Sequence, residues 1–452
     1  MKIKNIKIKY FTFSAYECTA IQEFLEEMAS EGWLLESISG SRFKFTKIEP
    51  KNLKFSVEPV PQISTLDVKD SNTALEYREY CESAGWNYVC ERGNLQIFYR
   101  HKNSEIIPIH TDENEKFKSI FKSSLFDIVL KLLLIALIAF NIYNSISYGS
   151  ISYFLSSNLS LASTIVFLVL ILVNIVEVTS FTKWSIQAKR KLNNGEFLPY
   201  NTLKQLRRKN LINRCIAASL LIFFLLTVII DSNNFADAST SILISVSMVL
   251  VILLVDIFTR KFLLKPKYSK RTNILIRCGS IIFTFFLGMF VMISTIMGIA
   301  GDGFIGKNNV LSSNPPLTLN DFNLSSSEPT ELYVDENTSI IAKNIFYSDS
   351  SYEQYLSYSL FESNYTWAIN AVVNSSVKFE NKIRKDINPN YTLKSPSIIN
   401  GVKVYSFGDY NNSYLFISDN KILEIDNSFE NISKENFISL ILNKVFNKDI
   451  TL

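Results

Sequence analysis

"ASEGWLLESI", residues 29–38, and "ESAGWNYVCE", residues 82–91, decide the fold of the N-terminal part of this chain. In each stretch, charged helical sequence runs into a Gly-Trp pair, and the two pairs lie 53 residues apart. Glycine takes up the left-handed conformation that commonly ends a helix. The spacing therefore predicts an internal repeat, in which a helix stops at glycine and Trp33 or Trp86 opens the next strand.

The rest of each repeat follows the same order of elements. A strand comes first, "IKIKYFTF" in one copy and "LKFSVEPV" in the other, and apolar residues at i, i+3 and i+7 then indicate a helix. Ser39-Gly40 and Gly93-Asn94 are typical of tight hairpin turns. The last strand carries Phe43 and Phe45 in the first copy, and Ile97 and Tyr99, one residue out of step, in the second. Residues 1–105 are expected to form a duplicated β-α-β-β head.

Two roles are open for Trp33 and Trp86. Because both follow the helix stop at the same distance, the favoured interpretation is that each fills the gap between its helix and its sheet. The alternative is that the two repeats face each other across a ligand or peptide cleft lined by aromatic residues.

Five apolar runs follow the head, at about 125–147, 159–181, 212–230, 240–259 and 275–300. Each is close to the roughly 20 residues that a helix needs to cross the hydrocarbon layer. Soluble helices rarely stay apolar on every side, which disfavours five buried helices of a soluble core. After a juxtamembrane linker at 106–124, residues 125–300 are therefore expected to form a five-helix transmembrane region.

Charges in the connections predict the orientation of these helices. Nine Lys and Arg residues lie between 183 and 214 and seven between 260 and 277, whereas 148–158 and 231–239 hold none. Basic connections stay in the cytoplasm. The N-terminus is therefore expected inside and the C-terminal part outside, with a linker at 301–331 and an α+β domain at 332–452. The five cysteines agree, since none lies beyond residue 278.

"EFLEEMASEGWLLESI", "RFKFTK", "LKFSVEP" and "EYREYCESAGWNYV" together resemble the bacterial membrane-protein family catalogued as domain of unknown function 2812. The resemblance covers roughly residues 7–102. It implies a cell-envelope protein, and because that family has no established activity, it supplies no catalytic residues.

Candidate chemistry is sparse. "GDGFIG" at 301–306 fits the Gly-x-Gly-x-x-Gly pattern, but an apolar run precedes it and no helical sequence follows, so a nucleotide site is not expected. The two histidines, His101 and His110, lie where the head passes into the linker, without neighbouring ligands. The sequence therefore predicts no catalytic residues, no cofactor and no metal site.

Four charged residues lie in or beside the apolar runs: Asp127, Lys131, Glu177 and Asp256. Charge in hydrocarbon is costly, so such residues are candidates for function. Pairing near the inner leaflet is favoured over a proton or ion path, because no charge is predicted near the bilayer midplane.

These patterns favour a non-enzymatic sensor, relay or accessory protein that couples a cytoplasmic and an extracytoplasmic domain. The expected partners are the bilayer, anionic lipid headgroups at the basic inner loops and, as an alternative, an acidic protein; a nucleic acid is not expected. A transporter or transporter subunit is the second hypothesis, and an enzyme acting on lipids is the weakest.

Overall fold

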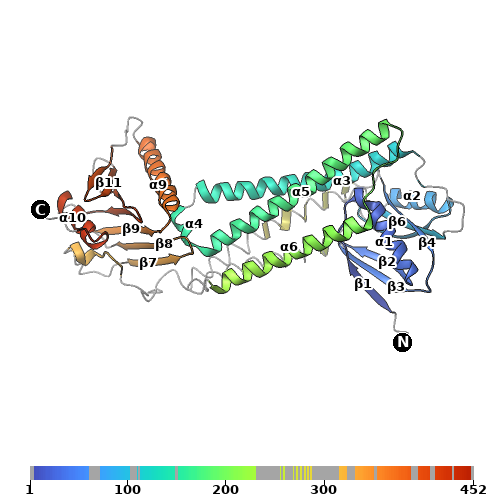
Figure 1. The fold of residues 1–452 in the computed structure, drawn as a ribbon, viewed down its shortest axis with the longest axis horizontal. Helices are drawn as coiled ribbons and strands as arrows, with labels where there is room; N and C mark the ends of the chain where they lie inside the picture. The colour runs from blue at the N-terminus through green and yellow to red at the C-terminus, as the bar shows by residue number, and fades with distance from the viewer. Residues whose placement is uncertain are drawn as a thin grey trace. The chain divides into compact units, whose positions relative to one another are not determined.

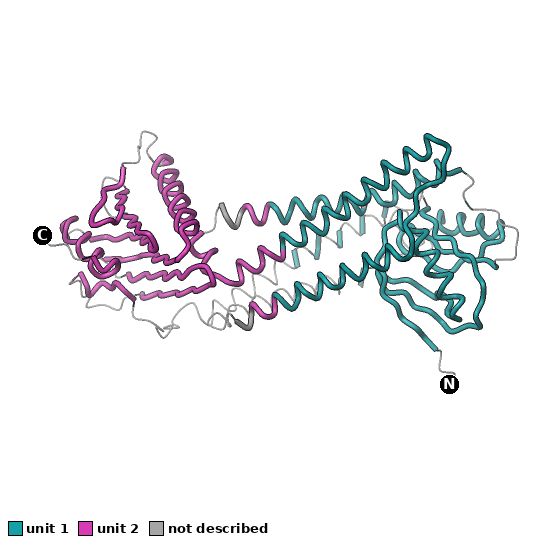
Figure 2. Tube along the Cα trace, viewed as in Figure 1, with its two compact units in different colours: residues 1–139, 167–223, 240–295 teal, residues 140–166, 224–239, 296–452 magenta. Residues whose placement is uncertain are grey.

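The structure, a computed structural model, describes residues 5–60, 72–101, 109, 112–147, 151–230, isolated positions between 255 and 287, 315–322, 331–350, 354–387, 395–407, 413–429 and 432–448. The chain divides into two compact units (Figure 2). Unit 1 comprises residues 1–139, 167–223 and 240–295, and unit 2 comprises residues 140–166, 224–239 and 296–452.

Unit 1 contains the head, which consists of two copies of one β-α-β-β motif (Figure 1). Each copy forms a three-stranded antiparallel sheet, with strand orders β1-β3-β2 and β4-β6-β5. The elements of the first copy are β1 (Ile6–Tyr10), η1 (Ala15–Glu17), α1 (Cys18–Ser30), β2 (Trp33–Ser39) and β3 (Arg42–Lys47). Those of the second copy are β4 (Leu53–Pro59), α2 (Asn72–Ser83), β5 (Asn87–Arg92) and β6 (Leu95–His101).

The two copies match in backbone detail. Gly32 and Gly85, which end the helices, both have φ of 85°, and the hairpin glycines Gly40 and Gly93 have φ of 58° and 60°. The register of β2 on β3 shifts between Leu35 and Ser37, and that of β5 on β6 shifts between Tyr88 and Cys90, at the corresponding places. The internal repeat predicted from the Gly-Trp pairs is confirmed.

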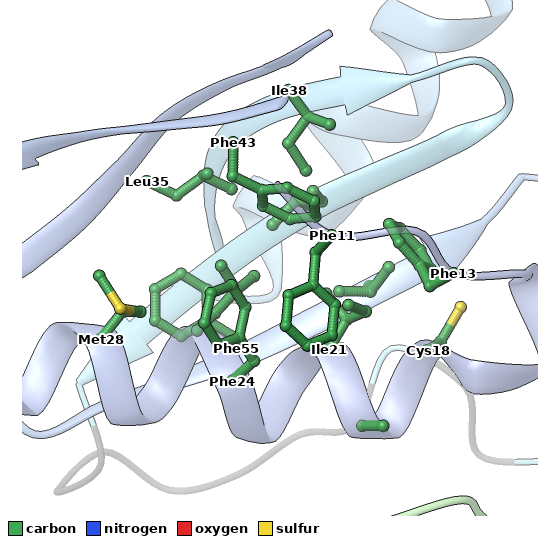
Figure 3. Close-up of a cluster of buried hydrophobic side chains, with 14 of the residues drawn as sticks. Phe11, Phe13, Cys18, Ile21, Phe24, Met28, Leu35, Ile38, Phe43 and Phe55 are labelled. Atoms are coloured by element: carbon green, nitrogen blue, oxygen red, sulfur yellow. The ribbon is translucent and has the colours of Figure 1, made fainter. Parts of the chain in front are cut away.

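Helix α1 lies in a core that both copies share. Its apolar residues recur at the spacing of one helix face, and they pack against β2 of its own copy and β4 of the other. Phe11, Phe24 and Phe55 lie together on this face (Figure 3), and the rings of Phe11 and Phe24 stack with their centroids 4.8 Å apart. Burial of each such side chain contributes about 1.5–3 kcal/mol.

Strand β6 is buried on both faces, and this explains the apparent change of step between the copies. Leu95 and Ile97 join the core around α1, whereas Phe98 packs with Cys81 and Trp86 beneath α2. The residue equivalent to Phe43 is Gln96, because Ile38 pairs with Phe43 and Glu91 pairs with Gln96. The two copies are therefore in step, and the side chain of Gln96 is fully buried at the position of a phenylalanine.

Three helices among the described residues are long and apolar enough to cross a membrane: Glu113–Tyr143, Asn158–Asn193 and Leu203–Thr227. They correspond to α3 (Glu113–Ser147), α5 (Asn158–Asn193) and α6 (Leu203–Ile230). In each, only 6% of the most apolar 18-residue window is buried within the protein, so most of this apolar surface needs another cover. The predicted spans at 240–259 and 275–300 lie largely outside the described residues.

Unit 2 contains a seven-stranded antiparallel sheet with the order β10-β11-β12-β13-β9-β8-β7. Helix α9 (Thr366–Ile387) covers one face and α10 (Lys434–Lys444) the other, because alternate strand residues join two separate apolar clusters (Figure 1). The strands are β7 (Glu331–Thr338), β8 (Lys343–Ser350), β9 (Tyr355–Glu362), β10 (Ser397–Ile399), β11 (Val402–Phe407), β12 (Ser413–Ile417) and β13 (Lys421–Asn427).

This domain confirms the α+β class predicted for it, and residues outside its predicted bounds add to its core. Leu317, Leu319 and Phe322, from the predicted linker, are buried in the cluster on the α10 face, where Leu319–Phe322 forms the short helix η4. Helix α4 (Ile151–Ser156) packs on the other face of the sheet, against α9.

Candidate functional site

The strongest candidate site in unit 1 is the junction of the head with the start of α6. Residues of α6 that contact the head recur at the spacing of one helix face. The backbone N–H of Leu203 donates to Glu23 Oε2 at 2.9 Å, and Arg207 donates to both carboxylate oxygens of Glu27 at 2.7 and 2.8 Å. Further along, Leu206 is buried in the core around α1, and Arg214 donates to the carbonyl of Tyr10.

Asn210 is the centre of this junction. Its Oδ1 accepts hydrogen bonds from both the backbone N–H and the hydroxyl of Thr12, each at 2.8 Å, and its Nδ2 donates to the Thr12 carbonyl at 2.9 Å. The side chain is only 5% exposed. Three hydrogen bonds between one buried amide and one residue fix the distance and direction of the segment that leads from β1 into η1.

Beside Asn210, a chain of charges connects the head to three helices. Lys209 of α6 pairs with Glu17 of η1 at 3.0 Å, and its Nζ lies 3.9 Å from Glu177 Oε1 of α5. Glu177 also pairs with Lys131 of α3. Glu17 is 3% exposed and accepts a second hydrogen bond, from the backbone N–H of Ser14, at 2.8 Å. We call these four side chains, Glu17, Lys209, Glu177 and Lys131, the charge chain. Negative and positive charges alternate along it.

An aromatic cluster packs next to the charge chain. Tyr16 of η1 lies against Phe181 and Trp184 of α5, with ring centroids 5.8 and 5.6 Å apart. Phe117 and Phe121 of α3 complete the cluster. Burial, aided by the charges of Glu17 and Glu177, raises the pKa of Tyr16, so its hydroxyl stays protonated at neutral pH.

A cavity of about 810 Å³ opens between these elements, and charged, aromatic and apolar side chains line it. Glu17, Glu177 and Lys209 line it together with Tyr16 and Trp184. The apolar part of the wall comes from α5 and α6 and comprises Val169, Leu172, Val173, Val176, Leu206, Ile212 and Ile216. Such a cavity suits an amphiphilic molecule or a neighbouring apolar segment.

Two buried thiols of the head, Cys18 and Cys81, are poor nucleophiles. Burial raises the pKa of Cys81 to about 12 and also raises that of Cys18, so both thiols are protonated and weakly nucleophilic at neutral pH. Among the described residues, no group of three or more His, Cys, Asp or Glu is placed to hold a metal ion.

The structure places Trp33 and Trp86 in different apolar clusters. Trp33 is half-buried against the shared core around α1, with Lys7 Nζ 5.1 Å from its ring centroid. Trp86 is 5% exposed and packs with Cys81 and Phe98 beneath α2. Each side chain therefore has packing partners of its own, while a ligand cleft lined by both stays a prediction.

Two of the four charged residues predicted in the apolar runs meet directly, since Lys131 pairs with Glu177. Asp127 lies within electrostatic reach of Arg92 in the head: burial lowers the pKa of Arg92, and the charge of Asp127 acts against that change. Arg92 itself donates to the carbonyl of Phe13 at 3.2 Å. Asp256 lies outside the described residues.

Sequence reasoning missed Glu17 and Asn210, and it assigned Lys209, Arg207 and Arg214 to the lipid headgroups. In the structure these three basic residues contact the head. Attraction of the remaining basic residues to anionic lipid stays a prediction. Two signals were present in the sequence: the Ser-x-x-Glu pattern that ends at Glu17, which commonly marks a helix start, and the regular spacing of the contacting residues along α6.

Comparison with known proteins finds a match that covers most of the head and the first part of α3. Residues 17–133 match the family described as "Protein of unknown function (DUF2812)". This match, which runs from η1 into α3, confirms the family resemblance inferred from the Gly-Trp repeat. No curated protein and no solved structure matches the chain.

Proposed function

We propose that this protein is a five-span membrane protein that relays a state of its C-terminal domain, outside the cell membrane, to its N-terminal head in the cytoplasm, without catalysing a reaction. The charge pattern of the connections supports this orientation. The predicted inner ends of α3, α5 and α6 carry the charge chain and the contacts with the head, and the predicted outer connection contains α4, which packs against α9.

The observation that carries the proposal is that α5 has specific contacts at both of its ends. At its start, Asn158 accepts a hydrogen bond from the backbone N–H of Ile340 at 3.0 Å and donates to the Thr338 carbonyl at 3.3 Å. Toward its other end, Phe181 and Trp184 pack on Tyr16. A continuous helix transmits a shift or rotation along its length, because its backbone hydrogen bonds resist local deformation.

A relay also needs a junction with two arrangements of similar free energy. The charge chain supplies a suitable element, since Lys209 lies between two carboxylates, 3.0 Å from Glu17 and 3.9 Å from Glu177. A small displacement of α5 relative to α6 would change which carboxylate Lys209 approaches more closely. The head would then be held more or less firmly through Glu17.

The topology is tested by labelling intact cells with a membrane-impermeant maleimide. Glu435→Cys, at the exposed start of α10, should become labelled above the background of the native chain. Glu49→Cys, exposed in the head, should react only after the membrane is permeabilised. Labelling of Glu49→Cys but not Glu435→Cys in intact cells would overturn the proposed orientation.

The relay is tested by hydrogen exchange of the full-length protein in lipid nanodiscs. Asn158→Ala removes the contact of α5 with the C-terminal domain and should raise exchange in residues 12–17 of the head. Ser439→Ala, on the surface of α10, is the matched control in the same domain and should leave this exchange unchanged. Unaltered exchange at residues 12–17 in Asn158→Ala would count against coupling through α5.

The cavity in unit 1 favours one second candidate, a transporter or transporter subunit, because Glu177 and Lys209 line it together with apolar residues of α5 and α6. Glu177→Gln would abolish uptake of a substrate in that case. Under the relay proposal, the same variant changes head exchange and leaves transport across the membrane unaffected.

A further inference from the structure

One end of the seven-stranded sheet is fastened to the start of α5. The hydroxyl of Ser339 donates to the Leu155 carbonyl of α4 at 2.5 Å, and Asn158 binds the backbone of both Thr338 and Ile340. Asn158 is the first residue of α5, a helix apolar and long enough to cross a membrane. The turn between β7 and β8 therefore lies at the level where this helix begins.

Large apolar side chains gather at this end of the sheet and remain exposed. Ile340 is 81% exposed, Trp367 is 54% exposed, and Tyr365 is 49% exposed. The rings of Tyr365 and Trp367 lie 6.3 Å apart. The hydroxyl of Ser363 donates to the Ile341 carbonyl at 2.8 Å and accepts from the backbone N–H of Tyr365 at 3.1 Å, which holds the start of α9 beside the β7–β8 turn.

The residue types fit a bilayer boundary. Tyr and Trp are enriched where membrane meets water, because their rings favour the acyl chains while their polar atoms stay hydrated. Tyr153 of α4, which is 50% exposed, adds a further tyrosine five residues before Asn158. An exposed isoleucine next to the first turn of a membrane-crossing helix gains the apolar cover that it lacks in water.

We propose that Ile340, Tyr365, Trp367 and Tyr153 form a lipid-contacting edge, which rests in the headgroup and upper acyl region of the outer leaflet. This inference rests on the membrane topology proposed above and adds to it the partner of the C-terminal domain. The domain is then held against the bilayer by side chains as well as by the covalent connection. The packing of lipids in the outer leaflet therefore affects the state of the C-terminal domain that the protein relays.

Apolar burial, not charge, drives this contact. Two lysines at the same end of the sheet are paired: Lys343 Nζ lies 2.6 Å from Glu336, and Lys421 Nζ lies 2.9 Å from Glu362. Zwitterionic phosphatidylcholine therefore suffices as the lipid, and the contact is insensitive to salt. Contacts of basic segments with anionic headgroups, by contrast, weaken as salt is added.

The test uses the full-length protein in phosphatidylcholine nanodiscs, with and without bromine on the upper acyl carbons, which quenches nearby tryptophan. Subtracting the emission of Trp367→Phe from that of the native chain isolates Trp367 from the other three tryptophans. We expect the Trp367 emission to be lost in brominated discs and to resist aqueous iodide. These results should not change when salt is added.

Two further variants are made in the Trp367→Phe background. One should regain quenching by brominated lipid, and the other is a control away from the lipid-contacting edge. Ile340→Trp places a new indole on the lipid-contacting edge and should restore quenching by brominated lipid. Tyr355→Trp places it at the opposite end of β9, roughly 23 Å along the strand from Glu362 at 3.3 Å per residue. Tyr355 is 41% exposed, so its replacement should be quenched by iodide only.

Quenching of Trp367 and of Ile340→Trp by iodide but not by brominated lipid would overturn the lipid-contacting edge, and it would indicate an edge in water. This failure is distinguishable from failure of the proposed topology. If Glu435→Cys is still labelled from outside intact cells, the topology stands and only the lipid contact is lost.

Discussion

Lys209 of α6 and Glu17 of the head form an ion pair at 3.0 Å in which the carboxylate is almost wholly buried, with 3% of Glu17 exposed. Lys209→Met leaves that buried charge without its cation. The Lys209 side chain is 27% exposed. We therefore expect the stability of the head to fall by about 2 kcal/mol, less than the roughly 3–5 kcal/mol lost when a fully buried ion pair is broken. Urea unfolding of the detergent-solubilised protein measures this loss.

Lys183→Met is the control for this prediction, because Lys183 also lines the cavity but is exposed. It should change stability little. Adding Glu17→Gln to Lys209→Met should recover part of the loss, since it removes the buried charge. A double variant less stable than the sum of the two single changes would contradict this account of the pair.

Gly32 and Gly85 offer a matched comparison, because both have φ of 85° and both end a helix of the repeat. A Cβ at Gly85 meets nothing within 4 Å, so Gly85→Ala should cost about 1 kcal/mol, from the left-handed backbone alone. A Cβ at Gly32 would lie 2.9 Å from the Ile48 carbonyl oxygen, so Gly32→Ala should cost about 3 kcal/mol. Equal losses in urea unfolding would show that the contact with Ile48 is relieved without cost.

The two repeat tryptophans should differ in the same assay. Trp86 is 5% exposed and Trp33 is half-buried. We expect Trp86→Ala to destabilise the head by about 3–5 kcal/mol, because it leaves a cavity beneath α2, and Trp33→Ala by about 2 kcal/mol. If neither change lowers stability and a binding activity disappears instead, the packing account is wrong and the cleft hypothesis gains support.

The C-terminal domain should lose stability as the pH rises. Burial raises the pKa of Glu424 on β13 above its ordinary value of 4.5, and the charges of Glu380 and Asp426 raise it further, against a hydrogen bond from Ser376. Between 4.5 and the raised value, the folded domain holds a proton that the unfolded chain has released. The free energy of unfolding therefore falls as the pH rises through that window, and the stabilisation from the bound proton is fully present below it.

Hydrogen exchange of α9 and β13 in the full-length protein, corrected for the intrinsic pH dependence of exchange, measures this effect. Glu424→Gln should make the pH profile shallower, because it removes one titrating group while Glu380, whose pKa burial also raises, remains. Glu435→Gln, at the exposed start of α10, should leave the profile as it is in the native chain. A stability that increases with pH across this window would reverse the sign predicted for Glu424.

The sequence predicted the repeat in the head because local chemistry determines it: glycine ends each helix, and a hairpin glycine follows eight residues later. It did not predict that Gln96 takes the place of Phe43. Alternation of apolar residues assumes one buried face, whereas β6 has a second buried face because α1 of the other repeat lies against it. Such burial depends on tertiary packing, to which no local pattern is sensitive.

The candidate site was predicted only in part, for a related reason. Lys131 and Glu177 are conspicuous in the sequence because charges are rare in apolar runs. Glu17 and Asn210 lie among other polar residues, where nothing distinguishes a buried partner from a solvated surface residue. Their roles follow from the fold, which brings Thr12 and Asn210 together across 198 positions of sequence.

The position of α1, packed on a strand of the other repeat, has a consequence for the history of the head. A polypeptide with only the first repeat would leave that side of α1 bare, and a second molecule would have to cover it. Joining two copies in one gene makes the association permanent and independent of concentration. The sequence of the second helix, α2, can then diverge, because α2 no longer has to make the packing contacts that α1 makes.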